Sequence, residues 1–289
     1  MKKILLTGFS GYVGGIIGRF LEGTAELHTL SARCAPGERT WRCDLADREQ
    51  VEAVASALSP DLIIHAAGLK DIALCEREPA LAHAANAQST LNLLEAFPRA
   101  SRVIYISTDY VFDGHQGNYS ETSPTYPATV YGQSKLAAEK IGMNSSDRFY
   151  VLRLAALYDS RSTFIRFLRG ALSRGQSVDC YSDVCYGPTY YKDFLAMLHG
   201  MITRERLERR IYHVVGEPVS RYGFARAYAE IARFDPGLVR PSKRPADGCF
   251  LFPEMWLTDT LSRRELDVPR LSHSEALRQI HEEEISASV

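Results

Sequence analysis

The sequence lacks any apolar run of the roughly 20 residues that a membrane-spanning helix requires. The longest candidate, residues 194–202, is interrupted by His199 and Gly200. An excess of charge of either sign is also absent, because 34 Lys and Arg residues stand against 35 Asp and Glu residues and leave a net charge of −1. Nucleic acids and anionic membrane surfaces need a concentrated positive surface, so we expect neither as a partner.

Cysteine pairs with redox or metal-binding spacing are missing as well. The six cysteines form no Cys-x-x-Cys pair and have no histidine neighbour at metal-ligand spacing. They are Cys34, Cys43, Cys75, Cys180, Cys185 and Cys249. In a chain of this length they indicate reduced thiols of a cytoplasmic protein, without disulfides or a bound metal. Glycine soon interrupts the apolar start of the chain, which argues against a secretory signal peptide.

The first half of the sequence alternates short apolar runs with segments of helical periodicity. Strands are predicted at residues 3–7, 26–31, 61–65, 102–107 and 149–154. Helices are predicted between them at residues 12–22, 47–58, 79–97 and 129–141. Strands that are apolar on both faces and separated by helices indicate a parallel sheet covered on both sides. Right-handed crossovers make this a doubly wound, Rossmann-type α/β sheet.

After about residue 155 this alternation becomes irregular. Helices are predicted at 162–174, within 188–202, at 221–234 and at 272–284, with a strand at 211–215. The last helix begins with the Ser272-x-x-Glu275 spacing of a capping box. We therefore expect a dinucleotide-binding domain over residues 1–155 and a smaller, mixed α/β, mainly substrate-binding part over 156–289. A strand and a helix around 188–234 are expected to return to the first domain.

A glycine-rich turn, T-G-F-S-G-Y-V-G, follows the first predicted strand directly. Gly8 allows the tight turn, Gly11 lets the backbone approach a pyrophosphate, and Gly14 lets the next helix pack closely. The N-terminus of that helix offers N–H groups to the phosphate charge. An ordinary strand-to-helix turn is the alternative, but the position at the start of a βαβ unit favours a cofactor. The expected contacts come from Gly8, Phe9, Ser10, Gly11, Tyr12, Val13 and Gly14.

The residues after the second strand favour NADPH, with NADH as the alternative cofactor. An NAD-specific site has an acidic residue for the ribose hydroxyls, roughly 20 residues past the glycines. This chain has no carboxylate at positions 31–33, where Ser31 and Arg33 could hold a 2′-phosphate through charge-assisted hydrogen bonds. A solvated arginine at a strand end is the alternative interpretation. Asp44, after a short strand predicted at 40–43, could hydrogen-bond the adenine amino group.

A Tyr-x-x-x-Lys pair occurs on the predicted helix at residues 129–141. The side chains of Tyr131 and Lys135 lie one turn apart on the same helix face. A neighbouring ammonium stabilises a phenolate, so we expect Lys135 to lower the pKa of Tyr131 and make its phenol a proton donor to a carbonyl. Ser107 and Thr108, at the end of the fourth strand, complete a constellation that a surface helix alone would not require.

Three motifs carry a resemblance to a known family: T-G-x-x-G-x-x-G at 7–14, S-T-D-Y-V-F-D-G at 107–114 and Y-G-x-S-K at 131–135. With them the chain resembles the extended short-chain dehydrogenase/reductase superfamily. Within it, the chain is most similar to the dTDP-4-dehydrorhamnose reductase family of sugar-nucleotide 4-ketoreductases. Further agreement comes from H-A-A-G at 65–68, from E-x-E-P at 76–79 leading to Asn86 and Ala87, and from Y-G-P-T at 186–189.

The resemblance implies a role for each of three side chains. Thr108 would hydrogen-bond the substrate oxygen, Tyr131 would donate the proton, and Lys135 would tune Tyr131 and hold the nicotinamide ribose. It also implies a nucleotide-sugar substrate, and it is compatible with a homodimer because relatives are often dimers. Further cofactor contacts are implied for Leu45, Ala66, Ala67 and Gly68.

One departure from the family pattern and one property of the family keep other functions open. The family commonly has a tryptophan after the fifth strand, whereas Ala156 stands at that position here. The family architecture also includes a non-catalytic regulatory subunit of methionine adenosyltransferase, so the fold alone does not establish catalysis. An epimerase, a dehydratase or a reductase of another substrate is a further alternative. Asn86 is a candidate for the water relay that many short-chain reductases place on this helix.

His65, at the end of a predicted strand, could lie beside Thr108, Tyr131 and Lys135, and a core or surface role is the alternative.

Overall fold

The computed structural model describes residues 1–245 and 250–286. The described part of the chain divides into two compact units. Unit 1 comprises residues 1–112, 125–153 and 205–212, and unit 2 comprises 113–124, 154–204 and the described residues from 213 on. Cys249 lies outside the described residues, and the other five cysteines are free thiols.

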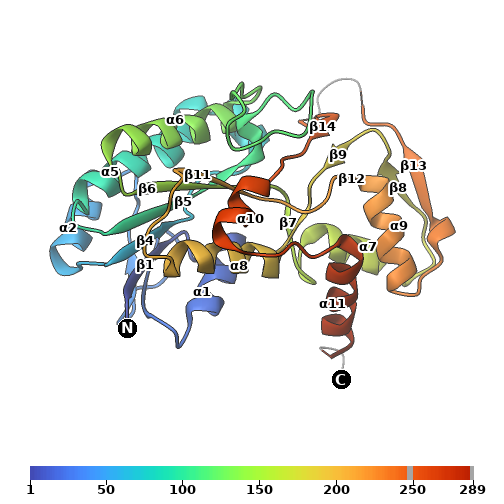
Figure 1. Ribbon diagram of the computed structural model, residues 1–289, viewed down its shortest axis with the longest axis horizontal. Helices are drawn as coiled ribbons and strands as arrows, with labels where there is room; N and C mark the ends of the chain where they lie inside the picture. Colours follow the sequence, from blue (N-terminus) through green and yellow to red (C-terminus); the bar gives the residue numbers. More distant parts are fainter. Residues whose placement is uncertain (246–249, 287–289) are drawn as a thin grey trace. The chain divides into compact units, whose positions relative to one another are not determined.

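A seven-stranded sheet is the centre of unit 1, and its strand order is β11-β6-β5-β4-β1-β2-β3 (Figure 1). The strands are β1 (Lys3–Thr7), β2 (Glu26–Ser31), β3 (Thr40–Arg42), β4 (Leu62–His65), β5 (Arg102–Thr108), β6 (Phe149–Leu154) and β11 (Ile211–Val214). β1 pairs in parallel with β2 and β4, β2 with β3, and β4 with β5. The predicted Rossmann-type sheet is confirmed.

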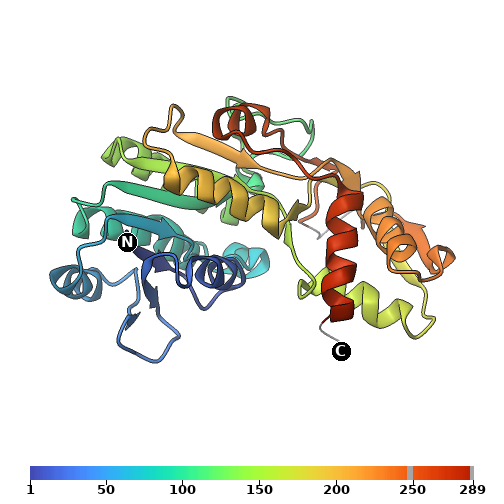
Figure 2. The ribbon, with the colours of Figure 1, turned by 60° about the horizontal axis from the view of Figure 1, so that its bottom comes forward.

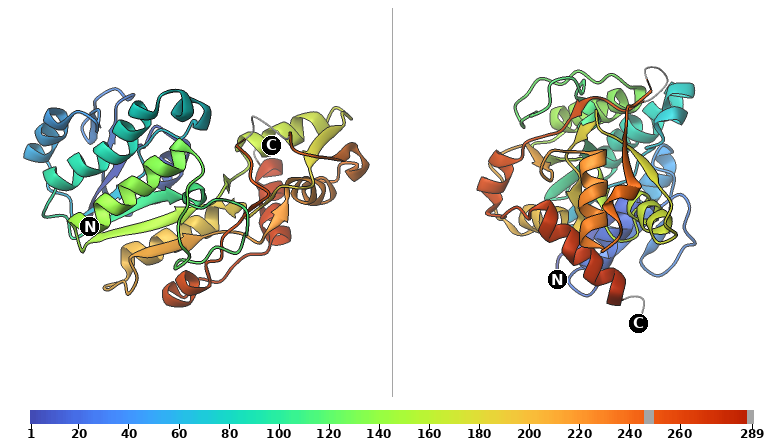
Figure 3. Two further views of the ribbon diagram at one scale, coloured as in Figure 1. Left: turned by 90° about the horizontal axis from the view of Figure 1, so that it is seen from above. Right: turned by 90° about the vertical axis from the view of Figure 1, so that its right-hand side faces the viewer.

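Helices cover both faces of this sheet. α1 (Tyr12–Leu21) lies on one face, and α2 (Arg48–Ala57), α5 (Ser89–Ala96) and α6 (Val130–Ser145) lie on the other (Figures 1 and 3). Val51 and Val54 of α2, Leu93 of α5 and Ala138 of α6 are buried against strand residues such as Tyr105 in one apolar core. This burial explains why the strands are apolar on both faces.

The helical stretch predicted at 79–97 is interrupted. It consists of α4 (Pro79–His83), a π-helical turn η1 (Ala84–Gln88) and α5, and a short α3 (Ile72–Arg77) precedes it. Pro79 occupies the first turn of α4, where its missing N–H costs no hydrogen bond. π-helical turns are rare and are frequently found at functional sites. This one contains Asn86, so the change in helix geometry coincides with a residue of the expected site.

β11 comes from a late part of the chain and lies beside β6 (Figure 2). The backbone N–H of Val151 donates to the carbonyl of Arg210 at 2.8 Å, which continues the pairing just before β11. The predicted strand at 211–215 therefore extends the main sheet. A short 3-10 turn, η2 (Asp109–Val111), follows β5 in the same unit.

Unit 2 is built from short strands and five helices in its described residues. The helices are α7 (Thr163–Leu172), α8 (Tyr191–Thr203), α9 (Arg221–Ile231), α10 (Thr260–Leu266) and α11 (His273–Ser286), with a 3-10 turn η3 (Pro236–Leu238). The strands are β7 (Leu157–Tyr158), β8 (Val178–Tyr181), β9 (Cys185–Tyr186), β10 (Thr189–Tyr190), β12 (Val219–Ser220), β13 (Val239–Ser242) and β14 (Glu254–Met255), in three small sheets.

The apolar core of unit 2 lies between α7, α9 and α11. Leu168, Phe224, Tyr228 and Leu277 are buried in it, and α9 and α11 lie side by side (Figure 3). The capping box predicted at the start of α11 is confirmed, because the Ser272 N–H and hydroxyl both donate to the Glu275 carboxylate, at 2.9 and 2.7 Å.

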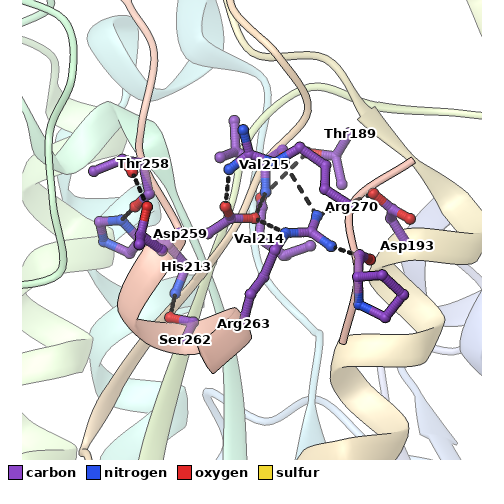
Figure 4. A network of polar contacts seen from close by, with 12 residues as sticks. Thr189, Asp193, His213, Val214, Val215, Thr258, Asp259, Ser262, Arg263 and Arg270 are labelled. Atoms are coloured by element: carbon purple, nitrogen blue, oxygen red, sulfur yellow. Dashed lines mark hydrogen bonds and ion pairs between the residues drawn. The ribbon is translucent and has the colours of Figure 1, made fainter. Parts of the chain in front are cut away.

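A buried polar network holds α10 in place within unit 2 (Figure 4). The fully buried carboxylate of Asp259 accepts a hydrogen bond from Arg263 Nε at 2.7 Å and another from Arg270. Arg263 also donates to Asp193 of α8 at 3.0 Å. The backbone N–H of His213 donates to Ser262 Oγ at 2.8 Å. His213 is buried within this network, in keeping with a core role.

Candidate active site

The start of α6 brings the Tyr-x-x-x-Lys pair to the end of strand β5. The Thr129 side chain caps the helix by accepting a hydrogen bond from the Gly132 N–H at 3.0 Å. A Cβ atom at position 132 would lie 2.0 Å from the carbonyl oxygen of Tyr110, so only glycine permits this close approach of α6 to η2. Because Tyr110 lies two residues after Thr108, this approach places Tyr131 beside Thr108.

The Thr108 hydroxyl lies near enough to the Tyr131 phenol to lower its pKa. The Thr108 hydroxyl donates to Asp109 Oδ1 at 3.0 Å and accepts from the Tyr110 N–H at 3.3 Å. The ring of Tyr110 lies edge-on to that of Tyr131, with the centroids 5.8 Å apart. The two hydroxyls that the sequence predicts for substrate binding and proton donation therefore lie next to each other.

The expected lowering of the Tyr131 pKa is wrong for this structure. The Tyr131 side chain is partly buried, and its removal from water raises the pKa of Tyr131 well above its ordinary value, while the nearby Thr108 hydroxyl only partly opposes the rise. The neighbouring carboxyl of Asp109 adds to it, and burial raises the pKa of Asp109 itself to about 7. The Tyr-x-x-x-Lys pattern identifies the neighbours of Tyr131 correctly but not how far its phenol is removed from water. Removal from water has the larger effect on its pKa.

Lys135 is buried on the side of α6 that faces β5. Its ammonium donates to the carbonyl oxygen of Ile106 at 2.8 Å and lies 4.0 Å from the ring centroid of Tyr105. Burial lowers the pKa of Lys135 to about 7, and the carboxylate of Glu139 opposes this shift. A Cβ atom at Gly68 would lie 3.9 Å from Lys135 Nζ, so the loop after β4 runs beside this lysine.

Asn86 connects that loop to the catalytic helix. Its Oδ1 accepts from the Leu69 N–H at 2.8 Å, and its Nδ2 donates to the Leu69 carbonyl at 3.1 Å and to Ser134 Oγ at 2.8 Å. Ser134 in turn donates to the Tyr131 carbonyl at 2.8 Å. Both amide hydrogens of Asn86 are thus engaged by protein groups, which favours a structural connection over a water relay.

The glycine-rich turn has the geometry that a dinucleotide requires. Gly8 has a φ of +70°, and a Cβ atom there would lie 2.5 Å from the Ala67 backbone nitrogen, so glycine is needed both for the turn and for the close contact. Gly11 is the N-cap of α1 and provides no side-chain cap. The start of α1 therefore fits a pyrophosphate. A Cβ atom at Gly14 would collide with the Gly8 carbonyl, so glycine is also needed where α1 packs against the turn.

Ser31 lies beside this turn, and Arg33 follows two residues later. Ser31 Oγ is 2.6 Å from Ser10 Oγ and accepts from the Arg33 N–H at 3.2 Å. The Arg33 side chain is exposed. Asp44 accepts from the Ala46 N–H at 3.0 Å within its own turn, and Leu45 is buried with its carbonyl accepting from Asn92 at 2.9 Å.

Sequence reasoning missed Arg42. It ends β3 and pairs in register with Ser31 of β2 in a parallel ladder, so the two side chains leave the same face of the sheet. Arg42 is exposed, like Arg33. Two arginines therefore flank the serine that contacts the glycine-rich turn. The sequence feature that could have identified Arg42 is its position at the end of the strand that pairs with β2.

His65 is a core residue at the end of β4. Its ring nitrogens lie 2.7 Å from Thr7 Oγ1 and 3.1 Å from Thr90 Oγ1, and the side chain is fully buried. Burial lowers the pKa of His65 to about 3, with a smaller contribution from the charge of Lys135. Among the described residues, no group of three or more His, Cys, Asp or Glu side chains is arranged to hold a metal ion. Likewise, none of the described helices is long and apolar enough to cross a membrane.

A Rossmann-type sheet, a glycine-rich phosphate turn and an adjoining Thr108, Tyr131 and Lys135 together define an extended short-chain dehydrogenase/reductase. The family model described as "RmlD substrate binding domain" matches residues 1–247. The chain therefore belongs to the RmlD substrate-binding-domain family, as its motifs indicate.

Curated relatives and solved structures agree with this assignment. A dTDP-4-dehydrorhamnose reductase of Mycobacterium tuberculosis is 34% identical over 249 residues, which cover 83% of this chain and 79% of the relative. The methionine adenosyltransferase 2 subunit beta of Xenopus laevis is 28% identical over 255 residues, which cover 83% of this chain and 75% of the relative. The crystal structure of dTDP-4-dehydrorhamnose reductase from Bacillus anthracis in complex with NADP has the same fold, with a TM-score of 0.86, 23% identity and coverage of 98% and 100%.

Proposed function

We propose that this chain is an NADPH-dependent reductase that converts the 4-keto group of a nucleotide-activated 6-deoxy sugar to a hydroxyl group. Family membership and the names of its reductase relatives support this reaction. The observation that carries the proposal is the proximity of Thr108 and Tyr131, with Lys135 one helical turn further on and the glycine-rich turn in the same unit.

The chain's own residues bind and orient the carbonyl and supply the proton. The Tyr131 hydroxyl donates to the carbonyl oxygen of the substrate, and the Thr108 hydroxyl, which here donates to Asp109, turns to donate to the same oxygen. Because burial raises the pKa of Tyr131, the phenol keeps its proton at neutral pH and releases it only to a strong base such as a developing alkoxide. The Lys135 ammonium stabilises the phenolate that results. When NADPH is bound, its nicotinamide supplies the hydride.

The residues of unit 1 fit the cofactor. Gly8, Phe9, Ser10, Gly11, Tyr12, Val13 and Gly14 would surround the pyrophosphate, and Ser31 and Arg33 would hold the 2′-phosphate. Asp44 and Leu45 would contact the adenine, and Tyr131 and Lys135 the nicotinamide ribose. Ala66, Ala67 and Gly68 would line the cofactor between these two ends, since this segment runs from Gly8 to Lys135. The support is the steric need for glycine at position 8 and the contact of Ser31 with Ser10.

A cofactor-binding regulatory subunit is the second candidate. The similarity to the methionine adenosyltransferase beta subunit favours it, because that similarity covers most of the chain. An intact Thr108, Tyr131 and Lys135 favours the reductase, since a regulatory subunit has no need of a proton donor. A protein that binds NADPH tightly without consuming it in the presence of sugar nucleotides would support the second candidate.

The test is turnover with a defined substrate. Purified protein, NADPH and dTDP-4-dehydrorhamnose are mixed, NADPH absorbance is followed, and the product is identified by NMR. We expect one NADPH to be oxidised for each ketone reduced, and no oxidation with Tyr131→Phe. Tight NADPH binding without oxidation would contradict the proposal for this substrate. A parallel set of UDP-linked and other 4-keto sugars tests whether Ala156, at the position of the family's tryptophan, changes the substrate.

Three further properties are part of the proposal. Residues 1–155 form the cofactor-binding domain and 156–289 mainly the substrate-binding part, supported by the position of the glycine-rich turn and of Tyr131 in unit 1. A cytoplasmic location is supported by the five free cysteines among the described residues. A homodimer is proposed from the family resemblance, and sedimentation velocity tests it.

A further inference from the structure

A buried ion pair lies behind the catalytic residues. Glu139 of α6 is 1% exposed and Arg153 of β6 is 2% exposed. Arg153 donates from Nη2 to Glu139 Oε2 at 2.7 Å and from Nε to Oε1 at 3.1 Å. Oε1 also accepts from the Ser107 hydroxyl at 2.5 Å. The carboxylate of Glu139 thus has three donors and no exposure to solvent.

Stability alone does not account for this arrangement. Taking two charges out of water costs about as much as their attraction returns, and apolar side chains of similar volume often serve equally well. The surroundings already supply apolar packing, since the Arg153 guanidinium lies 5.1 Å from the ring centroid of Phe112. A charged pair at this place therefore calls for a further explanation.

Glu139 joins the two elements that carry the active site. Tyr131, Lys135 and Glu139 recur every four residues and so share one face of α6. The partner of Glu139 on β5, Ser107, immediately precedes Thr108. A single carboxylate thereby connects the helix that carries the proton donor to the strand that carries its hydroxyl partner.

The groups around Lys135 leave Glu139 as the counter-charge. His65 faces it from β4 and is neutral because burial lowers its pKa to about 3. The ring of Tyr105 faces it from β5, and burial raises the pKa of that phenol so that it stays neutral. From α6 itself come Tyr131, also neutral, and Glu139, whose negative charge opposes the effect of burial on Lys135.

Two further titratable groups face Tyr131 rather than Lys135. Asp109 lies on η2, with a pKa raised to about 7 by burial, and Cys75 lies on α3, with a raised pKa that keeps its thiol protonated. The cation of Arg153, on β6, is paired with Glu139. Removal of the Glu139 charge would therefore leave the ammonium of Lys135 buried without an anion nearby.

We infer that Glu139 is a positioning residue, which keeps Lys135 in its ammonium form and fixes the helix of Tyr131 against the strand end of Thr108. The role of Glu139 in catalysis depends on the proposed reductase function, whereas its effect on the charge of Lys135 does not. The side chain of Glu139 hydrogen-bonds Ser107 and Arg153 rather than the reacting groups, so it acts through Lys135 and Ser107.

The first experiment measures the titration of Lys135 directly. The whole protein is labelled with lysine enriched in ¹³C at the ε carbon, and the Lys135 signal is assigned with Lys135→Arg. Its NMR titration midpoint is compared in the wild type, Glu139→Gln and the double variant E139Q/R153Q, which removes both charges and leaves no unpaired buried arginine. Glu52→Gln removes a carboxylate from an exposed helical ion pair with Arg48 and serves as the matched control.

We expect the midpoint of Lys135 to fall by about 1 pH unit or more in Glu139→Gln, the lower end of the effect of a nearby opposite charge. The fall should be smaller in the double variant, because that variant also removes the positive charge of Arg153. Glu52→Gln should leave it unchanged. If Glu139→Gln does not fold, the double variant decides the question. An unchanged midpoint in a variant that melts cooperatively would overturn the inference, and so would an equal shift with Glu52→Gln.

The second experiment measures turnover against pH, with NADPH and dTDP-4-dehydrorhamnose. In the Glu139 variants the loss of activity on the alkaline side should begin at lower pH, with turnover reduced tenfold or more above neutrality and recovering as the pH falls. A merely structural role predicts a uniform loss at all pH values. A wild type that does not turn over this sugar would contradict the proposed substrate and leave the NMR result to decide the role of Glu139.

Discussion

The two arginines beside Ser31 allow a quantitative prediction about cofactor choice. Arg33→Ala and Arg42→Ala each remove one cation from the region where a 2′-phosphate would lie. A hydrogen bond to a charged group contributes about 1.5–3 kcal/mol. Both side chains are exposed, so solvent and salt screen the interaction, and the lower end of this range applies. We expect each substitution to weaken NADPH binding about tenfold, since ~1.4 kcal/mol corresponds to tenfold in affinity.

NADH provides the internal reference because it lacks the 2′-phosphate. Its affinity should change less than about twofold in either variant, so the NADPH preference should fall in proportion. The double variant should lose somewhat less than the product of the two effects, because both arginines act on one phosphate. Higher ionic strength should reduce the preference in the wild type and barely affect it in the double variant.

The assay is a fluorescence titration of both cofactors against the wild type and each variant. Arg39→Ala is the matched control, since Arg39 is exposed in the same segment but is not the residue in register with Ser31. Equal affinities of the wild type for NADPH and NADH would refute the reasoning. An unchanged ratio in Arg33→Ala would show that Arg33 does not contact the 2′-phosphate. An equal loss in Arg39→Ala would show that general charge rather than position sets the preference.

Three other predictions follow from the site. Tyr131→Phe should lower turnover by about 10²–10⁴ while cofactor affinity changes little, because only the proton donor is removed; near-native turnover would place the donor elsewhere. The free energy of unfolding should fall as the pH falls from about 6.5 to about 3, because unfolded His65 binds a proton in that window and the buried ring does not. Urea titrations at a series of pH values measure this, and a His65→Gln variant whose free energy of unfolding has the same slope against pH would contradict it. Water elimination from a 6-hydroxy sugar nucleotide should not occur, because the residue after Asp109 is Tyr110, whose phenol is a poor replacement for a second carboxylate as a base. Release of a 4-keto-6-deoxy product from dTDP-glucose, detected by NMR, would falsify the reductase assignment.

The features predicted well from the sequence are those that local chemistry determines. The apolar strands, the glycine-rich turn and the helix from Thr129 onward each depend on nearby residues, and the structure contains all three. The adjacency of Tyr131 and Lys135 follows from helical spacing alone. The place of Ser31 beside the turn follows from the known geometry of a βαβ unit.

The features that were missed depend on contacts between distant segments. The partial burial of Tyr131 depends on how closely α6 approaches η2, and a spacing rule does not report this distance. The π-helical turn at Asn86 accompanies hydrogen bonds to Leu69 and Ser134, which lie 17 and 48 residues away in the chain. Arg42 becomes relevant only once the β2–β3 register is known.

The pairing of β11 with β6 has a consequence for how the chain is made. β6 ends at residue 154, but its outer neighbour is not synthesised until residue 211. While residues 155–210 emerge from the ribosome, the N–H and C=O groups along one side of β6 have no strand to pair with. An exposed, apolar strand edge invites pairing with other chains. A fragment ending near residue 155 would keep this edge open permanently, so it should aggregate even though it contains Tyr131, Lys135 and the whole glycine-rich turn.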